Sequence, residues 1–323
     1  MRQDALQKLL KSVKVQTTFP TEILIIDGST NTSTQTMIYK NEIKNLKYFL
    51  VSNKNRGLTK QRNFGISKVS KTSEVVFFVD DDTILENNYF EESIKTFNSD
   101  SLIVGVGGVA INENNWKIID NKKNYNKNIY YKFENYIYPE GQRNVLRNYL
   151  NLSSNLGPGK MPSFSHGRTC GFPLNGKTYE VDLLIGMSFS FRRIVFENIN
   201  FSTYFEGYGL YEDADYSIRA LKFGKNVINT KAQLQHFHNP SGRPNQYKYG
   251  KMVVKNGWYV WRVKNHFPKF IDRLKWNSIT ILLIIIRFSN IFTTNKRKEA
   301  FTEALGRTVA LINLIFSKPK LQS

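Results

Sequence analysis

Three consecutive carboxylates, Asp80, Asp81 and Asp82, follow directly on the short apolar run 75–79. A run this short, and this rich in β-branched and aromatic residues, predicts a strand buried on both faces, as in parallel sheets. Ligands of open α/β sheets bind beyond the carboxyl ends of the strands, where clustered acids need a positive partner. Hard oxygen ligands suit Mg²⁺ or Mn²⁺ together with a substrate diphosphate. The alternative is a polar turn that caps the next helix.

A second group of acids crowds the first turn of a predicted helix over residues 212–223. Glu212, Asp213 and Asp215 lie where the helix dipole favours negative charge. Asp215 and Arg219 are four residues apart, so we expect them to pair. Helix stability alone therefore explains much of this pattern.

Two of the four histidines, His236 and His238, follow a predicted short strand or loop over residues 227–235. In an extended chain their side chains point to the same side, because the side-chain period is two. A lone histidine is usually structural, and for this pair a structural role and contact with a metal or phosphate both remain open. Arg243, a few residues further on, is a candidate to hold phosphate.

The segments that must position these groups alternate apolar runs with amphipathic stretches, a pattern that predicts βαβ units on a parallel sheet. The predicted helices cover residues 2–15 and 59–69, and the predicted strands cover residues 22–26, 48–51, 75–79 and 102–111. The last strand is rich in glycine, which permits close approach of backbones. It lacks the Gly-x-Gly-x-x-Gly spacing of a dinucleotide-binding loop.

The composition of the chain limits which kinds of partner and compartment we expect. The formal net charge of +20 predicts an anionic partner such as nucleic acid, anionic lipid or a phosphorylated substrate. The single cysteine, Cys170, excludes an internal disulfide and fits a reducing compartment. No apolar segment opens the chain as a secretory signal would. No uninterrupted apolar run reaches the roughly 20 residues that span a bilayer.

Over half of the excess charge lies in residues 251–323, which hold fourteen Lys and Arg against three acids, a net charge of +11. Aromatic residues such as Trp258, Trp261 and Trp276 are interleaved with these cations. Basic amphipathic helices with aromatic anchors lie in the interface of anionic bilayers. We therefore expect this tail at an anionic membrane surface. The alternative is that its helices pack on the rest of the protein with their lysines in solvent.

The order of three motifs in the first 110 residues is more specific than any one of them. Asp27-Gly28-Ser29, the stretch 55–66 (Asn-Arg-Gly-Leu-Thr-Lys-Gln-Arg-Asn-Phe-Gly-Ile) and the triplet at 80–82 resemble the nucleotide-binding half of family 2 glycosyltransferases of the GT-A fold. The resemblance implies that Asp27 contacts the nucleobase. It also implies that Arg62, or less closely Lys60, lies near the base or the phosphates.

The same resemblance implies that Asp82 is the main metal ligand and that Asp80 and Asp81 contact the ribose or the metal. The alternatives are that Asp27 caps a helix and that Arg62 lies on a solvated helix face. In this fold a histidine after the last core strand often completes the metal shell, which implies His236 or, as the better candidate, His238.

The second half of the resemblance covers residues 177–243. The pattern Gly-x-Gly-x-x-Glu-Asp-x-Asp-x-x-x-Arg at 207–219 is similar to the Glu-Asp motif of the family, which implies that Asp213 is the general base. Glu212 beside it is implied to help hold the acceptor, and its charge disfavours a second full charge nearby. Gly186 and Met187 are implied to line the donor sugar pocket, with Arg219 on the sugar and acceptor side.

The sequence departs from the family at its start. Family members open with a strand that ends in Pro-Thr-x-Asn-Arg or a similar motif, placed before the helix that Arg2 begins here. An absent inner strand leaves unpaired backbone groups and an exposed apolar edge. We therefore expect either a true start further upstream or a truncated product with weak or absent activity.

Taken together, these features predict an α/β protein of the GT-A type: a Rossmann-like nucleotide-diphospho-sugar transferase whose mixed sheet is flanked by helices, with C-terminal amphipathic helices. The predicted segments are a nucleotide-sugar-binding half at 1–110, a variable insertion over the active site at 111–176, an acceptor-binding and catalytic half at 177–250, and the basic tail at 251–323. The insertion is poor in periodicity, so a linker without fixed structure is the alternative there.

The expected activity is metal-dependent transfer, inverting by resemblance, of a sugar from a nucleoside diphosphate sugar, expected to be a UDP-sugar, to a hydroxyl of a surface polysaccharide or lipid-linked glycan. The expected cofactor is Mn²⁺ or Mg²⁺, and the expected location is cytoplasmic, peripheral at the inner face of the cell membrane. A nucleic-acid-binding protein is the main rival, but carboxylates at strand ends repel phosphate, so we expect no nucleic-acid partner. A sugar-nucleotide pyrophosphorylase and an inactive truncated glycosyltransferase are two further rivals.

Overall fold

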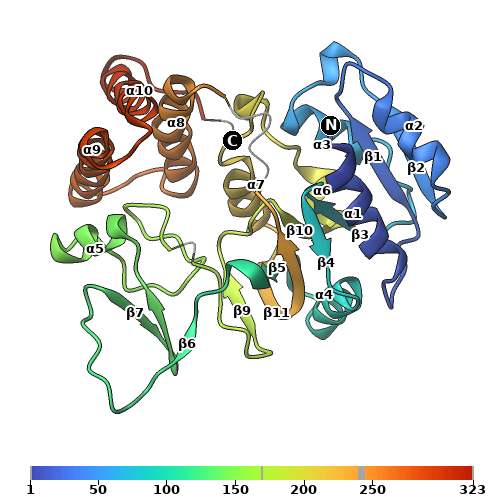
Figure 1. Cartoon of the computed structure of the whole chain (residues 1–323), viewed down its shortest axis with the longest axis horizontal. Helices are drawn as coiled ribbons and strands as arrows, with labels where there is room; N and C mark the ends of the chain where they lie inside the picture. The colour runs from blue at the N-terminus through green and yellow to red at the C-terminus, as the bar shows by residue number, and fades with distance from the viewer. Residues whose placement is uncertain (1, 169, 239–243, 322–323) are drawn as a thin grey trace. The chain divides into compact units, whose positions relative to one another are not determined.

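The computed structural model describes residues 2–168, 170–238 and 244–321, and it divides the chain into two compact units. The first unit comprises Met1–Asn114 and Leu174–Ser241, and the second comprises Asn115–Pro173 and Gly242–Ser323. The variable insertion and the basic tail, which we predicted as separate segments, therefore belong to one unit. Figure 1 shows the elements of both units in the colours of the chain.

The first unit contains the predicted alternation of helices and strands. Its elements are α1 (Gln3–Lys14), β1 (Ile23–Asp27), α2 (Ser33–Lys40), β2 (Leu46–Leu50), α3 (Leu58–Ile66), β3 (Val75–Val79), β4 (Thr83–Leu85), α4 (Tyr89–Ser99), β5 (Ile103–Ala110), the 3-10 helix η2 (Ile111–Glu113), β9 (Thr178–Val181), β10 (Ser188–Arg192), α6 (Arg193–Asn198), α7 (Glu212–Ala220) and β11 (Lys225–His236). The predicted elements of the first 111 residues are confirmed with small shifts of their ends. The long strand β11 replaces the short strand or loop expected there.

The strands of the first unit form a two-stranded and a six-stranded sheet. β1 and β2 pair in parallel, and the larger sheet runs β3-β10-β5-β11-β4, with β9 beside β11. β10 is antiparallel to both β3 and β5, whereas β11 is parallel to β5 and antiparallel to β4. The predicted mixed α/β sheet is confirmed, and among the described strands the parallel pairs are β1 with β2 and β5 with β11. β10 follows the long insertion rather than a simple helical crossover, so its direction is not tied to that of its neighbours.

The apolar strand β3 is less buried than its sequence predicts. All five residues of Val75–Val79 are only partly buried. β3 stands at the end of the strand order and pairs with β10 alone among the described strands, which explains its exposure. β5, in contrast, is buried along its whole length. A Cβ atom on Gly105 would clash with Asn226 Oδ1, so the close approach predicted for the glycines of this strand is confirmed.

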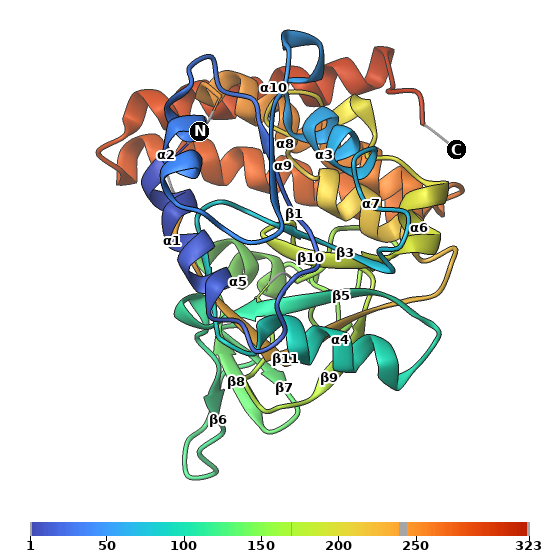
Figure 2. The same ribbon diagram turned by 90° about the vertical axis from the view of Figure 1, so that its right-hand side faces the viewer.

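Two helices complete the core of the first unit. The apolar stripe of α1 (Leu6, Leu9, Leu10 and Val13) is buried against residues that include Leu85 and Leu234. α4 lies along β5 and β11, as Figure 2 shows. These contacts fix the ends of β3, β4 and β11, which carry the predicted site residues.

The second unit joins a small sheet to three long helices. Its elements are β6 (Lys117–Ile118), β7 (Tyr130–Phe133), β8 (Tyr136–Pro139), α5 (Gln142–Tyr149), α8 (Gln246–Lys264), α9 (Phe270–Thr293) and α10 (Arg297–Phe316). Trp261 Nε1 donates a hydrogen bond to the carbonyl oxygen of Ser163 (2.7 Å), and Ser163 Oγ donates to Asp272 Oδ1 (2.8 Å). The insertion is therefore folded against the tail. That the insertion covers the active site remains a prediction.

The helices of the tail pack closely through glycine and tryptophan. A Cβ atom on Gly250 of α8 would clash with the carbonyl oxygen of Glu303, so the two backbones touch at this point. Trp261 of α8 stacks on Trp276 of α9 with ring centroids 5.3 Å apart. By length and composition alone, α9 is long and apolar enough to cross a membrane. α9 is 24 residues long, although its sequence holds no uninterrupted apolar run of that length.

Residues 171–178 have the spacing Gly-x-x-x-x-Gly-Lys-Thr of a phosphate-binding loop, which we did not predict. Such a loop opens a helix whose N-terminus faces the phosphate. Here the pattern leads instead into strand β9, which begins at Thr178. The stretch therefore lacks the helix on which that kind of site depends.

Candidate active site

Strand pairing brings the acidic triplet and a histidine together. The backbone N–H of Asp80 donates to the carbonyl oxygen of Met187 (2.9 Å), which ties the end of β3 to the start of β10. β4 then pairs with β11 so that Thr83 lies opposite His236. In consequence His236 Nε2 lies 3.6 Å from Asp82 Oδ1, although the two residues are far apart in the sequence.

The chemistry of this group fits a divalent cation. Ligand atoms of Asp80, Asp82 and His236 all lie within 4.8 Å of one another. Two carboxylates and one imidazole suit Mn²⁺ or Mg²⁺, which also take oxygen atoms from phosphates. Two of the residues are partly buried and Asp82 is buried, so the group is held in place by the fold. The assignment of Asp80, Asp82 and His236 as ligands stays a prediction that this geometry favours.

His238 has a different neighbour. Its Nε2 lies 2.9 Å from Glu113 Oε1, and the described group around Asp80 and Asp82 contains His236 instead. Glu113 was not predicted, because an acid in an Asn-rich stretch has no distinctive spacing. Arg243, the candidate phosphate contact, lies outside the described residues.

Arg2 also belongs to the site, although it was not predicted. Its Nη1 donates to Asp82 Oδ2 (2.7 Å), its Nε donates to Asp81 Oδ2 (3.2 Å), and its Nη2 contacts Asp81 Oδ1. The guanidinium thus offsets the charge of two neighbouring acids. A basic residue 79 positions before Asp81, at the start of a helix, carries no signal of this contact in a single sequence.

Arg62 of α3 joins the triplet to the second group of acids. Its Nη1 pairs with Glu212 Oε1, and its Nη2 lies 3.5 Å from Asp80 Oδ1. Only 9% of its side chain is exposed, and its guanidinium lies 4.9 Å from the centroid of the Phe189 ring. The alternative of a solvated helix face is therefore wrong for Arg62. Through this one side chain, the structure brings the two acidic groups to one place.

The start of α7 orients the predicted base. Tyr211, just before the helix, adopts a left-handed conformation with φ of 71°. Asp213 Oδ2 accepts a hydrogen bond from the backbone N–H of Gly186 (2.9 Å), and its Oδ1 accepts one from the N–H of Ala214 (2.8 Å). Arg62 Nη2 donates to the carbonyl oxygen of Gly186 (3.1 Å), so the same glycine contacts both charged groups.

The buried charges alter the proton affinity of the site. Burial raises the pKa of Glu212 to about 8, although the charge of Arg62 acts against this rise. Burial also raises the pKa of Asp80 to about 6, again opposed by Arg62. The pKa of His236 is raised as well, chiefly by its contact with Asp82. Burial acts to lower the pKa of Arg62, but Glu212 and Asp80 outweigh it and raise that pKa.

Three other predicted residues have partners of their own. Asp27 is fully buried and accepts hydrogen bonds from Tyr48 Oη (2.8 Å) and from the N–H of Ser29 (2.7 Å). The residue at the N-cap of α2 is Thr32, so Asp27 is not a helix cap.

Lys60 pairs with Glu206 at 3.1 Å, and Arg219 pairs with Asp215 at 2.6 Å as the spacing predicted. Met187 is buried beside the triplet. The contacts of these residues with a donor or an acceptor stay predictions.

Comparison with known proteins shows which families and folds the chain resembles. Residues 1–155 match the model of Glycosyl transferase family 2. A structure of GalNAc-T7 with UDP, GalNAc and Mn²⁺ is similar with a TM-score of 0.50 and 16% identity, over 80% of this chain and 47% of that one. The chain thus spans about half the length of GalNAc-T7 in that structure. The comparison with curated proteins found no match.

A second solved structure is similar over almost the whole chain. It is the mannosyltransferase PcManGT from Pyrobaculum calidifontis in complex with GDP-Man and Mn²⁺, with a TM-score of 0.52 and 10% identity, over 98% of this chain and 85% of that one. The mixed sheet and these two likenesses show that the chain has the GT-A fold of glycosyltransferases. The match to the model of Glycosyl transferase family 2 covers a little under half of the chain.

Proposed function

We propose that this chain transfers a sugar from a nucleoside diphosphate sugar to a hydroxyl group of an acceptor glycan, with inversion at the anomeric carbon. The observation that carries the proposal is the position of Arg62, which contacts Asp80 at the end of β3 and Glu212 at the start of α7. One side chain thereby joins the donor-side acids to the helix of the predicted base. The nucleotide UDP and the nucleotide sugar GDP-Man, bound in the two similar structures, support a nucleotide-sugar donor, which we propose to be uridine-based.

The donor end of the site is built from the triplet and its neighbours. Asp80, Asp82 and His236 would hold Mn²⁺ or Mg²⁺, and Asp81 would accept hydrogen bonds from the ribose. Asp27, at the end of β1, would accept a hydrogen bond from the nucleobase. When bound, the divalent cation supplies positive charge that stabilises the leaving diphosphate. Gly186 contacts Asp213 and Met187 contacts Asp80, so the two residues link the two acidic groups. We propose that they line the sugar site.

The acceptor end of the site is built around Asp213. Its carboxylate takes the proton of the acceptor hydroxyl while the hydroxyl oxygen forms a bond to the anomeric carbon. The bond from that carbon to the diphosphate breaks, and the nucleoside diphosphate leaves with the electron pair. Attack from the face opposite the leaving group gives inversion. Glu212, paired with Arg62, fixes the first turn of α7 and so the direction of Asp213.

The donor proposal is tested by thermal shift with UDP, GDP and CDP, each with and without Mn²⁺. We expect stabilisation by one nucleotide, UDP, only when the metal is present. Asp82→Asn should abolish this shift. Asp120→Asn, in an acid of the second unit whose side chain is 43% exposed, should preserve it. The proposal would be overturned if no nucleotide stabilised the wild-type protein under either condition.

The acceptor we propose is a surface polysaccharide or lipid-linked glycan, handled at the cytoplasmic face of the cell membrane. The support is the second unit, where large apolar side chains of α9 and α10 are exposed among many cations; Phe270, Phe292 and Phe316 are each more than 80% exposed. Exposed aromatic residues beside Lys and Arg suit an anionic bilayer surface.

The membrane proposal is tested by flotation with vesicles of phosphatidylcholine and phosphatidylserine. We expect the wild-type chain to float with anionic vesicles and the double variant Phe270→Ser, Phe292→Ser to float less. The matched control is the double variant Tyr39→Ser, Leu102→Ser, which removes two exposed apolar side chains of the first unit. Equal flotation of the wild type and the Phe270, Phe292 variant would contradict the proposal.

A further inference from the structure

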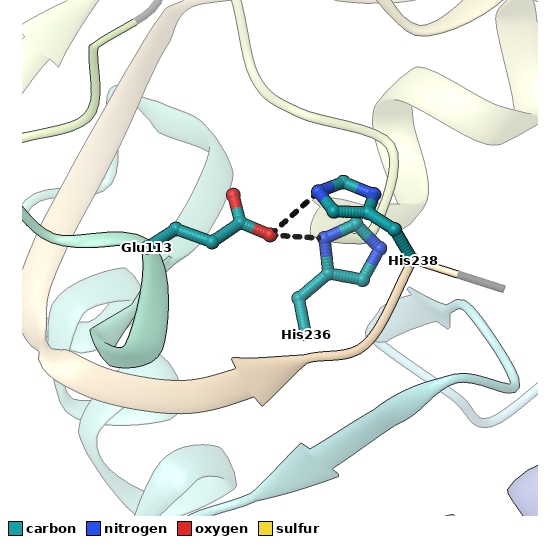
Figure 3. Close-up of side chains that lie close together, drawn as sticks. All are labelled: Glu113, His236 and His238. Carbon is teal, nitrogen blue, oxygen red and sulfur yellow. Dashed lines mark hydrogen bonds and ion pairs between the residues drawn. The ribbon is translucent and has the colours of Figure 1, made fainter.

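A cluster of two histidines and one carboxylate shares His236 with the proposed donor site, but its other members, Glu113 and His238, take no part in the proposed mechanism. Figure 3 shows Glu113 pointing at the rings of His236 and His238. Glu113 Oε1 lies 2.8 Å from His236 Nδ1 and 2.9 Å from His238 Nε2. The two rings meet edge to face, with centroids 4.2 Å apart. Three ligand atoms of different residues therefore converge on one point.

The backbone holds this cluster in place from two sides. Glu113 ends η2, which follows β5, and the histidines lie at the end of β11, which is parallel to β5. Asn112 Nδ2 donates to the carbonyl oxygen of His236 (2.8 Å), and the N–H of His236 donates to Asn112 Oδ1 (2.9 Å). This reciprocal pair fixes Glu113 opposite the histidines before any ligand binds.

We propose that Glu113, His236 and His238 form a second cation site that prefers Zn²⁺, and that zinc bound there weakens binding of the catalytic cation. Two imidazoles and one carboxylate are the ligand set of many zinc sites that keep a fourth position open. Imidazole ligands favour Zn²⁺ over Mg²⁺ and Mn²⁺, whereas the oxygen-rich group of Asp80 and Asp82 is of the kind that suits Mg²⁺ and Mn²⁺. The two groups differ in chemistry, but both contain His236.

The shared imidazole makes the two sites antagonistic. Nδ1 of His236 faces Glu113, and Nε2 faces Asp82 at 3.6 Å. A neutral imidazole has one nitrogen with a free lone pair, and the other carries a proton. When Nδ1 binds zinc, Nε2 carries the proton and donates toward Asp82, so it is lost as a ligand for the second cation. By linkage, each metal lowers the affinity for the other by the same factor.

The proposed zinc site does not depend on the proposed function. The antagonism does, because it requires the catalytic cation. The experiment is therefore done in two arms on the full chain. The first arm titrates Co²⁺, a spectroscopic probe for zinc sites, and follows its visible absorption, with Zn²⁺ as the displacing metal. The second arm measures Mn²⁺ binding by electron paramagnetic resonance, with and without one equivalent of Zn²⁺.

Two variants remove residues that belong only to the zinc cluster. His238→Ala and Glu113→Gln should weaken Co²⁺ and Zn²⁺ binding by more than about tenfold. In both variants Zn²⁺ should no longer affect Mn²⁺ binding, whereas in the wild type it should weaken Mn²⁺ binding by at least about fivefold. The matched control is His266→Ala, which removes an exposed histidine elsewhere and should behave as the wild type.

Three outcomes would contradict the proposal. Unchanged Zn²⁺ affinity in His238→Ala would show that the cluster is not a metal site. Weaker Mn²⁺ binding in His238→Ala without zinc would place His238 in the catalytic group instead. Zinc and manganese that bind the wild type independently would remove the antagonism. If Mn²⁺ does not bind at all, the proposed function fails, and the Co²⁺ arm still decides the zinc site.

Discussion

The backbone N–H of Gly186 donates a 2.9 Å hydrogen bond to Asp213 Oδ2. Gly186 belongs to the loop before β10, and Asp213 lies in the first turn of α7, so this bond ties the predicted base to the sheet. A carboxylate held by two backbone N–H groups points in one direction and needs no reorganisation to accept a proton.

Asp213→Asn should stop turnover and preserve donor binding. The amide has nearly the shape of the carboxylate but does not accept the proton of an acceptor hydroxyl. We expect a loss of about 10²- to 10⁴-fold in kcat, the usual contribution of a general base. The measurement is release of nucleoside diphosphate in the presence of acceptor, together with the metal-dependent thermal shift. A variant with wild-type turnover would exclude Asp213 as the base.

Gly186→Ala tests the contact between Gly186 and Asp213 by changing the glycine. The added Cβ would lie 3.1 Å from Asp213 Cβ and 3.2 Å from Glu212 Oε1, which is tighter than ordinary packing. We expect a loss of about 1–3 kcal/mol in the free energy of unfolding, because overpacking forces neighbours to move. Gly141→Ala is the control, since its added Cβ meets no atom within 4 Å. Chemical denaturation measures both, and equal losses would contradict this account.

Arg62→Met should strongly destabilise the first unit. At a pH above about 8, where Glu212 is ionised, the change leaves its buried carboxylate without a positive partner, and breaking a buried ion pair on one side costs roughly 3–5 kcal/mol. Lys60→Met is the matched control, because Lys60 lies on the same helix and pairs with the more exposed Glu206. An exposed pair contributes about 0–1 kcal/mol, so the control should change little. Similar effects of both variants in denaturant would refute a special role for Arg62.

Arg2→Gln should tighten the binding of a cation at the triplet. The guanidinium of Arg2 donates to Asp82 Oδ2 at 2.7 Å, so a cation that takes this oxygen must displace it. Removing a competing positive charge should raise Mn²⁺ affinity, and the acids that lose their partner should lower the stability of the metal-free protein. Calorimetric Mn²⁺ titration and metal-free denaturation measure the two effects. Weaker Mn²⁺ binding would show that Arg2 instead helps to hold the ligands.

The sequence was sufficient for local features and for motifs with a fixed order. The positions of Asp213 and of the triplet at element ends were predicted because they follow from short-range patterns. Arg2 and Glu113 were not found, since their roles depend on contacts across 79 and 123 residues that no local pattern encodes. The place of β10 between β3 and β5 could not be predicted for a related reason: strand pairing depends on where a long insertion returns the chain, which composition does not determine.

Binding of Mn²⁺ should weaken as the pH falls through about 6. Burial raises the pKa of Asp80 to about 6, so below that pH its carboxyl carries a proton and loses the charge that attracts a cation. The pKa of His236 is also raised, chiefly by Asp82, and a protonated imidazole has no lone pair for a metal. Above both pKa values the ligands are free of protons and the affinity should be constant.

The slope of Mn²⁺ affinity against pH distinguishes the contribution of Asp80 from that of His236. Each proton that the metal displaces changes the affinity by about tenfold per pH unit, so Asp80 and His236 together should give a slope near two at low pH. Asp80→Asn removes one titrating group and should leave a shallower slope, even though its affinity is lower at every pH. Mn²⁺ titrations between about pH 5 and pH 8 measure both slopes. An affinity that does not change over this range would mean that neither group releases a proton when the metal binds, which would contradict this prediction.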